Sequence, residues 1–227
     1  MRCRCKVQII KKGKINMKAL IFDLDGVIVS TDSLHYRAWK AMADGENIYF
    51  DEKINDRLRG VSRMDCLEIV LERATRSYTD EEKIALATKK NDLYRELLQV
   101  LTPADRLEGV TETLEKLRAM GYKLAIGSSS KNVPIILDKI GYADYFDAIS
   151  DGNNITRSKP DPQVFLMAAE YLGLDPAECY VVEDADAGIA AAKAGGFTAV
   201  GIGSAAQNKD ADHTLAKFTD LIDVVSK

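Results

Sequence analysis

Cysteine and histidine are scarce in this sequence of 227 residues, which has four cysteines and two histidines. No two cysteines are spaced as Cys-x-x-Cys, which argues against a structural zinc site and favours reduced thiols. The formal charge of −4 gives no basic footprint for nucleic acid or an anionic membrane. No apolar run approaches the ~20 residues needed to span a bilayer. We therefore expect a cytoplasmic enzyme or binding protein that interacts with neither nucleic acid nor membrane.

The first sixteen residues, MRCRCKVQIIKKGKIN, are basic and differ from the rest of the chain. Their apolar part, Val7–Ile10, is too short for the apolar region of a secretory signal. Met17 directly precedes the first strand-like run. We expect the folded protein to begin there and residues 1–16 to form a disordered extension.

From Met17 onward, short apolar runs alternate with amphipathic helical patterns. Runs without polar alternation are typical of strands buried on both faces, as in a parallel sheet covered by helices. The alternation predicts an α/β fold, a Rossmann-like doubly wound parallel sheet. The expected strands are Lys18–Phe22, Lys123–Ile126, Tyr180–Val182, Thr198–Ile202 and, more weakly, Phe146–Ile149.

Glycine and proline mark several helix ends in this alternating part of the chain. Gly121 follows the stripe formed by Val110, Leu114 and Leu117, in the position that ends a helix. Asp161-Pro162 predicts an N-cap followed by proline in the first helical position, and Gly173 ends the same helix.

Residues 32–101 interrupt the alternation with helical patterns and no convincing strand. Ser62–Asp65 and Thr79–Glu82 are typical of capping boxes that open two helices, and Thr102-Pro103 ends the segment. We predict an inserted all-helical cap at 32–101 and a core made of 17–31 and 102–227. The insertion follows the first strand, so it lies over the carboxyl edge of the sheet, where open α/β sheets bind ligands. The alternative is an extra helical layer packed permanently on the sheet.

Charged and hydroxyl side chains follow the expected strands. Asp23 and Asp25 follow the first strand, Ser128–Ser130 the second, and Glu183-Asp184 the run Tyr180–Val182, while Lys159 precedes a helix. Parallel strands bring these positions to one edge. Clustered carboxylates repel one another unless they share a cation, and an all-oxygen set suits Mg²⁺. Together with a lysine and hydroxyls, the set predicts phosphoryl transfer through an aspartate nucleophile, with the second aspartate as acid or base.

Four motifs in order, Asp23–Ile28 (DLDGVI), Ser128–Ser130, Lys159-Pro160 and Glu183-Asp184, resemble those of the haloacid dehalogenase (HAD) superfamily. The resemblance runs from Met17 to the C-terminus. It implies that Asp23 is the nucleophile, that Asp25 is the acid/base, and that Ser128 and Lys159 hold the transferring phosphoryl group. The implied Mg²⁺ ligands are Asp23, the backbone carbonyl of Asp25, Asp184 and, either as a ligand or as a neighbour of one, Glu183.

Within the superfamily, the helical segment resembles the β-phosphoglucomutase family. The matching segments are Thr31–Lys40 (TDSLHYRAWK), Arg59–Arg63 (RGVSR), Lys89–Asp92 (KKND), Thr102–Asp105 (TPAD) and Ser128–Asn132 (SSSKN). Members interconvert β-glucose 1-phosphate and glucose 6-phosphate through β-glucose 1,6-bisphosphate. The resemblance therefore implies an isomerase, a monomer whose partner is a small sugar phosphate. Arg59 and Cys66 depart from the lysine and serine expected in this family.

The resemblance also implies residues that bind the substrate. His35 lies beside the acid/base and couples it to cap closure, and Thr31 and the Thr102–Asp105 segment are hinges. Trp39 either packs inside the cap or forms a platform for the sugar. The non-transferring phosphate is gripped by Arg63 with the backbone at Gly60 and Val61, and from the core by Ser130, Lys131 and Asn132. Lys90 and Asn91 reach into the site from the cap.

Three other functions fit part of the pattern. A phosphatase of the same fold, acting on a sugar phosphate, would share every core residue. A carbon–phosphorus hydrolase would need a cap lysine that forms a Schiff base, and the cap lysines lie in polar helices that predict no apolar pocket around them. A non-catalytic binding protein is disfavoured because Asp23, Asp25, Lys159 and Asp184 are all present.

Overall fold

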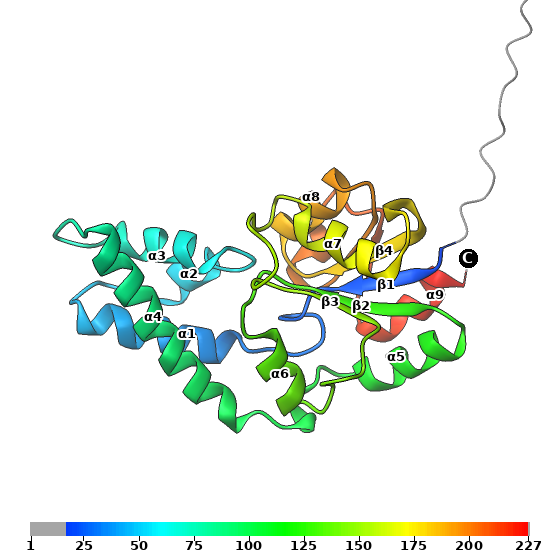
Figure 1. Cartoon of the computed structure of the whole chain (residues 1–227), viewed down its shortest axis with the longest axis horizontal. Coiled ribbons are helices and arrows are strands. Elements are labelled where there is room, and N and C mark those ends of the chain that lie inside the picture. Colours follow the sequence, from blue (N-terminus) through cyan, green and yellow to red (C-terminus); the bar gives the residue numbers. More distant parts are fainter. Residues whose placement is uncertain (1–16, 227) are drawn as a thin grey trace, which may run out of the picture.

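The computed structural model describes residues 17–226, and the expectation for residues 1–16 lies outside them. Six parallel strands form one sheet in the order β3-β2-β1-β4-β5-β6 (Figure 1). The fold class predicted from the sequence is confirmed, and each expected strand is present. The two-residue strand β6 was not predicted. The bounds are β1 Ala19–Phe22, β2 Lys123–Gly127, β3 Ala148–Ser150, β4 Cys179–Glu183, β5 Thr198–Gly201 and β6 His213–Thr214.

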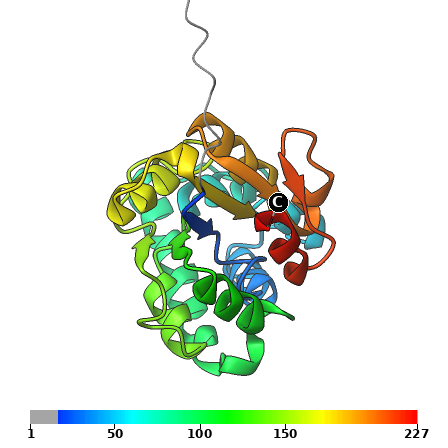
Figure 2. The ribbon, with the colours of Figure 1, turned by 90° about the vertical axis from the view of Figure 1, so that its right-hand side faces the viewer.

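Helices cover both faces of the sheet (Figures 1 and 2). The side chains of β1 alternate between two apolar clusters, with Leu20 and Phe22 on one face and Ala19 and Ile21 on the other. Helices α5, α6 and α9 pack on the first face, and α7 and α8 pack on the second. Their bounds are α5 Val110–Ala119, α6 Val133–Lys139, α7 Gln163–Leu172, α8 Asp186–Ala194 and α9 Leu221–Val225.

Between β1 and α5 the chain forms the predicted helical cap, drawn on the left of Figure 1. Its outer part has a separate apolar cluster that includes Trp39, Met42 and Leu67. The base of the cap differs, because Leu34 and Tyr94 belong to the same cluster as the sheet. The cap therefore has its own core and a buried root, and the limits 32–101 stay a prediction. Its helices are α1 Asp32–Gly45, α2 Glu52–Asp56, α3 Arg63–Leu71 and α4 Asp80–Leu97.

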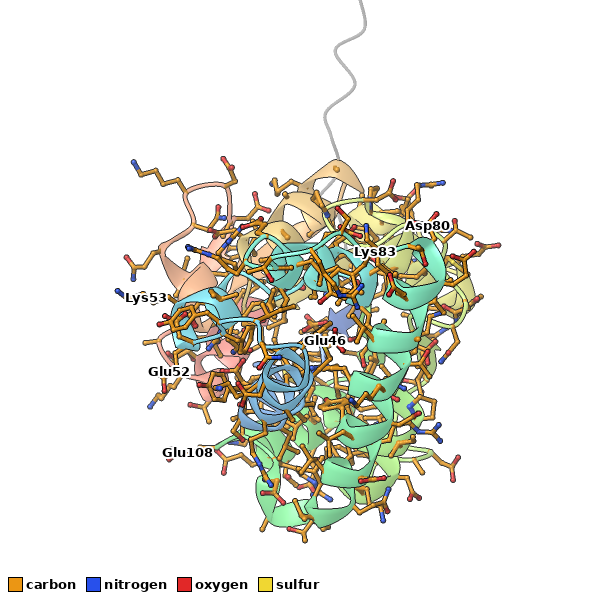
Figure 3. The ribbon with its side chains drawn as sticks, turned by 90° about the vertical axis from the view of Figure 1, so that its left-hand side faces the viewer. Glu46, Glu52, Lys53, Asp80, Lys83 and Glu108 are labelled. Atoms are coloured by element: carbon orange, nitrogen blue, oxygen red, sulfur yellow. The ribbon has the colours of Figure 1, made fainter. Side chains whose placement is uncertain are left out.

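Figure 3 looks at the cap from its outer side, where charged side chains such as Glu52, Lys53 and Asp80 point away from the helices. This face is polar, as expected for a helix side that contacts water. The apolar sides of the same helices face inward. The short 3₁₀ helices in the described part of the chain are η1 Leu98–Val100, η2 Pro103–Asp105, η3 Pro176–Glu178, η4 Gly203–Gln207 and η5 Phe218–Asp220.

Most predicted helix ends are confirmed. Gly121 follows α5 with φ +89° and Gly173 ends α7 with φ +69°, a left-handed conformation that favours glycine. Thr79 opens α4 with a complete capping box, whereas Ser62 caps α3 without the reciprocal bond. One prediction was wrong by a residue. Helix α7 begins at Gln163, so Pro162 precedes it, and the Asp161 carboxylate accepts a hydrogen bond from the Gln163 amide at 3.0 Å.

Candidate active site

The chain reverses its direction of winding at β1, which lies between β2 and β4. Such a switch point leaves a crevice beyond the carboxyl ends of the strands. Asp23 follows β1 directly, Ser128 follows β2, and Glu183 is the last residue of β4. These three side chains are buried, as is Lys159 from the loop before α7. The sequence-predicted core residues therefore meet at this edge of the sheet.

Lys159 joins two of the carboxylates. Its Nζ atom lies 2.7 Å from an Asp23 oxygen and also contacts Glu183. Burial alone would lower the pKa of Lys159, but the Asp23 and Glu183 carboxylates together raise it above its ordinary value. The lysine is thus a permanent cation beside Asp23. Such a charge is suited to an anionic group that binds against Asp23.

Three carboxylates at this edge form a set that fits a metal ion. Asp23, Glu183 and Asp184 each offer an oxygen within 4.8 Å of the others. Burial, followed by the negative charges of Asp23 and Glu183, raises the pKa of Asp184 to about 8. A cation between them would relieve that repulsion, and an all-oxygen set suits Mg²⁺. Gly26 permits the close approach, because a Cβ there would overlap the Asp184 carboxylate.

Glu183 has both of its oxygens engaged already. One contacts Lys159, and the other accepts a hydrogen bond from the Ala185 amide at 2.9 Å. A Cβ at Gly188 would overlap the Glu183 carboxyl group, so α8 packs tightly against this side chain. Of the two alternatives left open by the sequence, this geometry favours a Glu183 that orients Lys159 next to the metal site.

Asp25 lies in a separate hydrogen-bonded chain that leads into the cap. The buried Thr31 hydroxyl donates to the Asp25 carboxylate and lies 2.7 Å from the Tyr94 hydroxyl. Burial, opposed by the Thr31 hydrogen bond, raises the pKa of Asp25 to about 6. A carboxyl group that titrates near neutrality is suited to general acid–base catalysis. Tyr94 was missed from the sequence, although its spacing of four residues from Lys90 places both on one face of α4.

Lys90 was predicted to have no apolar pocket, and this prediction was wrong. Its Nζ atom lies 4.7 Å from the Trp39 ring centroid and 4.6 Å from that of Tyr94, and 2.9 Å from Nδ1 of His35. Burial lowers the pKa of Lys90 to about 7. Trp39 is only 2% exposed and belongs to the apolar cluster of the cap, so the first of its two expected roles is observed.

His35 stacks on Tyr94 with ring centroids 3.9 Å apart. Burial, followed by the positive charges of Lys90 and Arg63, lowers the pKa of His35 well below its ordinary value. The ring is therefore neutral at neutral pH. His35 does lie next to the chain that reaches Asp25, as expected from the sequence, through its contact with Tyr94.

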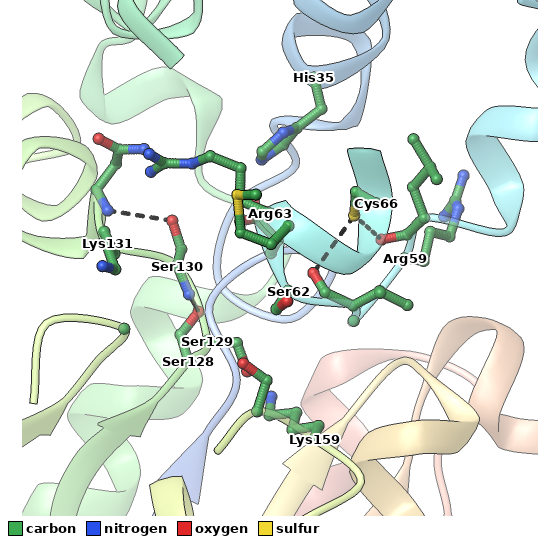
Figure 4. Close-up of a pocket in the computed structure, with 18 of the residues that line it drawn as sticks. His35, Arg59, Ser62, Arg63, Cys66, Ser128, Ser129, Ser130, Lys131 and Lys159 are labelled. Atoms are coloured by element: carbon green, nitrogen blue, oxygen red, sulfur yellow. Dashed lines mark hydrogen bonds between the residues drawn. The ribbon is translucent and has the colours of Figure 1, made fainter. Parts of the chain in front are cut away.

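The cap and the core enclose a cavity of about 520 Å³. Figure 4 shows His35 and Arg63 reaching it from the cap, with Ser128–Lys131 and Lys159 on the core side. The lining also includes Gly60, Val61, Lys90, Asn91 and Asn132. Every substrate-binding residue predicted from the sequence thus lies around one cavity.

Two arginines of the cap line this cavity and differ in their partners. Arg59 pairs with Asp32 at 2.8 Å and with Asp56 at 3.6 Å. Arg63 forms no ion pair with any residue in the described part of the chain, and its side chain extends toward Ser130 and Lys131 (Figure 4). Arg63 is therefore the guanidinium group available to an anion.

One hydrogen bond connects the cap and the core directly across this cavity. The Asn132 side chain donates to the Asn91 side-chain oxygen at 3.0 Å. The chain enters and leaves the cap through two segments that run side by side. The Leu107 amide, after the cap, donates a hydrogen bond to the Ile28 carbonyl, before the cap, at 2.9 Å. The Thr102–Asp105 segment beside them is closed by its own capping box. Its role as a hinge stays a prediction.

Within residues 17–226, no helix has both the length and the apolar character that crossing a membrane would require. Residues 17–196 match the model of the haloacid dehalogenase-like hydrolase family, and the chain belongs to that family.

Individual relatives have more specific activities than the family as a whole. A β-phosphoglucomutase of Bacillus subtilis is 43% identical over 207 residues, which is 90% of this chain and 92% of that protein. The fructose-1-phosphate phosphatase YqaB of Escherichia coli is 31% identical, over 81% of this chain and 95% of its own. The crystal structure of a β-phosphoglucomutase from Clostridium difficile superposes with a TM-score of 0.85 at 37% identity, covering 90% of this chain and 93% of that one. The relatives thus include both mutases and sugar phosphatases.

Proposed function

We propose that this enzyme is a β-phosphoglucomutase, which interconverts β-glucose 1-phosphate and glucose 6-phosphate through β-glucose 1,6-bisphosphate. The observation that supports the proposal is that two separate groups of cationic side chains line one cavity, each of which could hold a phosphate. Lys159 lies beside Asp23, and Ser128 follows the neighbouring strand β2, whereas Arg63 and Lys131 lie on the side formed by the cap and residues 128–132. A bisphosphate needs both positions, while hydrolysis of a monophosphate needs only the first.

In this mechanism the phosphorylated Asp23 transfers its phosphoryl group to the sugar 6-hydroxyl, and Asp25 accepts the hydroxyl proton. After the bisphosphate turns over, Asp23 attacks the phosphate at position 1, and Asp25 returns the proton to the leaving oxygen. Lys159 and Ser128 hold the phosphoryl group during both transfers. Asp23, the Asp25 backbone carbonyl and Asp184 would hold Mg²⁺, which would neutralise the negative charge of the transferring phosphoryl group.

Arg63 and Lys131 hold the second phosphate in each half of the reaction. A guanidinium group offers a bidentate contact and an ammonium group offers a point charge, so the pair is suited to a phosphate that must arrive and leave. The cap over the cavity keeps water from the phosphorylated Asp23. This exclusion is what separates a mutase from a phosphatase with the same core residues.

The deciding experiment is to incubate the protein with β-glucose 1-phosphate, Mg²⁺ and a trace of β-glucose 1,6-bisphosphate. We expect glucose 6-phosphate to form and little free phosphate. Free phosphate without glucose 6-phosphate would contradict the proposal and support a phosphatase, the activity named for the E. coli relative.

A further inference from the structure

The loop that follows β2 carries the core side of the proposed phosphate site, and a second loop supports it from behind. Strands β2 and β3 pair up to Gly127 and Ser150, and the Ser128 amide continues the pairing by donating to the Ser150 carbonyl at 3.1 Å. Beyond this point residues 128–132 and residues 151–154 run side by side. We call residues 151–154, Asp-Gly-Asn-Asn, the bracing loop.

We call residues 128–132 the phosphate loop. The bracing loop holds two successive backbone carbonyl groups of this loop. The Gly152 amide donates to the Ser130 carbonyl at 3.0 Å, and the Asn153 side-chain amide donates to the Lys131 carbonyl at 3.1 Å. The contact at Gly152 is tight, because a Cβ there would overlap the Ser129 carbonyl oxygen and press on Lys131. Packing and hydrogen bonds thus both fix the backbone at residues 129–131.

Asn153 is itself fixed by a buried carboxylate. Its side-chain nitrogen also donates to Asp151 at 3.0 Å, and its backbone amide donates to the other Asp151 oxygen at 2.8 Å. Asp151 is only 5% exposed. The Asn153 side chain is therefore aimed at the Lys131 carbonyl before any ligand binds, which is a form of preorganisation.

Two further side-chain hydrogen bonds of residues 128–132 are local, and a third joins Asn132 to Asn91 of the cap. The Ser128 hydroxyl accepts from the Ser130 amide at 3.3 Å, and the Ser130 hydroxyl accepts from the Asn132 amide at 3.2 Å. Such bonds span two residues and shape a turn. They do not anchor the turn to the rest of the core. The bonds from Gly152 and Asn153 provide that anchor.

We propose that Asn153 is a positioning residue, which holds the Lys131 backbone so that the ammonium group of Lys131 and the side chain of Asn132 meet the second phosphate of the substrate. The identity of the ligand, a second phosphate of the substrate, rests on the proposed function. The bracing itself does not, since its hydrogen bonds join only residues of this chain. Arg63 grips the same phosphate from the cap, and Asn153 gives the core half of that grip a fixed location.

The test compares Asn153→Ala with Asn154→Ala. Asn154 is the matched control, because its side-chain oxygen accepts from the Asp151 amide at 2.9 Å and it has no hydrogen bond to residues 128–132 within the described chain. Loss of one neutral hydrogen bond changes an equilibrium constant by roughly three- to tenfold. We expect Asn153→Ala to raise the KM for β-glucose 1-phosphate by this factor and to leave kcat for acetyl phosphate hydrolysis within about twofold.

A double variant distinguishes positioning from general loosening of the core. If Asn153 acts through Lys131 and Asn132, then Asn153→Ala raises KM by a smaller factor when Lys131→Met is already present than it does in the wild type. Additive losses would overturn the proposal, as would an unchanged KM in the single variant. Asn153→Asp keeps the shape and removes the donor, so it should raise KM at least as much as Asn153→Ala.

Amide hydrogen exchange in the protein without substrate separates this proposal from the proposed function. Asn153→Ala should speed exchange at residues 128–132 more than Asn154→Ala does. Faster exchange in a protein that makes no glucose 6-phosphate would keep the brace and reject the mutase. Unchanged exchange in an active mutase would reject the brace alone.

Discussion

In the core, the Lys159 ammonium is bonded to two carboxylates, whereas in the cap neither Arg63 nor Lys90 has an ion-pair partner among residues 17–226. The core cation is held in place by Asp23 and Glu183, which raise its pKa. The cap cations face the same cavity, and burial lowers the pKa of both. The core cation is thus paired within the protein, whereas Arg63 has no carboxylate partner in the described chain and Lys90, with a pKa of about 7, is only partly charged near neutral pH.

The largest effect expected from this comparison concerns the nucleophile. Asp23→Asn keeps the size of the side chain but removes the charge that attacks phosphorus. We expect turnover to fall by at least about 10⁴-fold, as for the loss of other catalytic nucleophiles. The measurement is glucose 6-phosphate formation at saturating substrate, with a thermal melt as a control for folding. Full turnover in the variant would mean that the core edge is not the reacting centre.

Asp25→Ala tests the second core carboxylate. Because its pKa is raised to about 6 and its position is fixed by Thr31, we expect it to transfer the proton in each step. A positioned acid or base contributes roughly 10²–10⁴-fold, so turnover should fall within that range. Single-turnover kinetics on the variant would measure this. A loss below about tenfold would show that Asp25 has another role.

Arg63→Ala and Arg59→Ala compare a free cap arginine with a paired one. A hydrogen bond to a charged group contributes about 1.5–3 kcal/mol, so Arg63→Ala should lower mutase flux by roughly 10- to 100-fold. Hydrolysis of acetyl phosphate, which has no second phosphate, should change much less. Arg59 already pairs with Asp32 and Asp56, so its loss should cost less than about fivefold. Equal losses on both substrates would make Arg63 a residue of the fold.

The smallest effect is on stability and concerns Lys90. Its pKa is about 7 in the folded protein, whereas the ordinary value for a solvated lysine, as in the unfolded chain, is 10.5. Between these values the unfolded chain binds more protons, so stability increases with pH in this range. Relative to Lys90→Met, the wild-type free energy of unfolding should rise by about 1.4 kcal/mol per pH unit above pH 7.

Urea unfolding at pH 7, 8 and 9 measures this dependence. Lys89→Met is the matched control, because Lys89 is the exposed neighbour on the same helix. The free energy of unfolding of Lys89→Met should change with pH in the same way as that of the wild type. Parallel curves for Lys90→Met as well would show that Lys90 is solvated in solution.

Sequence patterns predicted what depends on local order along the chain. The apolar runs located the strands, and parallel topology then brought Asp23, Ser128 and Asp184 to one edge without knowledge of any contact. The predicted start of helix α7 was wrong by one residue. The Asp161 carboxylate accepts a hydrogen bond from the Gln163 amide, two positions later, and the helix begins at Gln163. The sequence thus identified Asp161 as the side chain that hydrogen-bonds to the start of the helix, but it did not determine the first helical residue.

The features that were missed depend on contacts between distant segments. Lys90 lies in a polar stretch, DEEKIALATKK, and its burial arises from Trp39 on α1, which packs beside α4. Asn153 has no motif at all, and its role follows from the pairing of β2 with β3. Tyr94 reaches Thr31 across more than sixty positions of the sequence. Each is a tertiary contact that composition and periodicity do not encode.

The amide pair Asn91–Asn132, which joins the two halves of the molecule over the cavity, carries no net charge. Dissolved salt screens ion pairs but has little influence on a contact between neutral dipoles. Raising the ionic strength should therefore weaken the hold on a phosphorylated sugar while leaving the unliganded halves as closely joined as before.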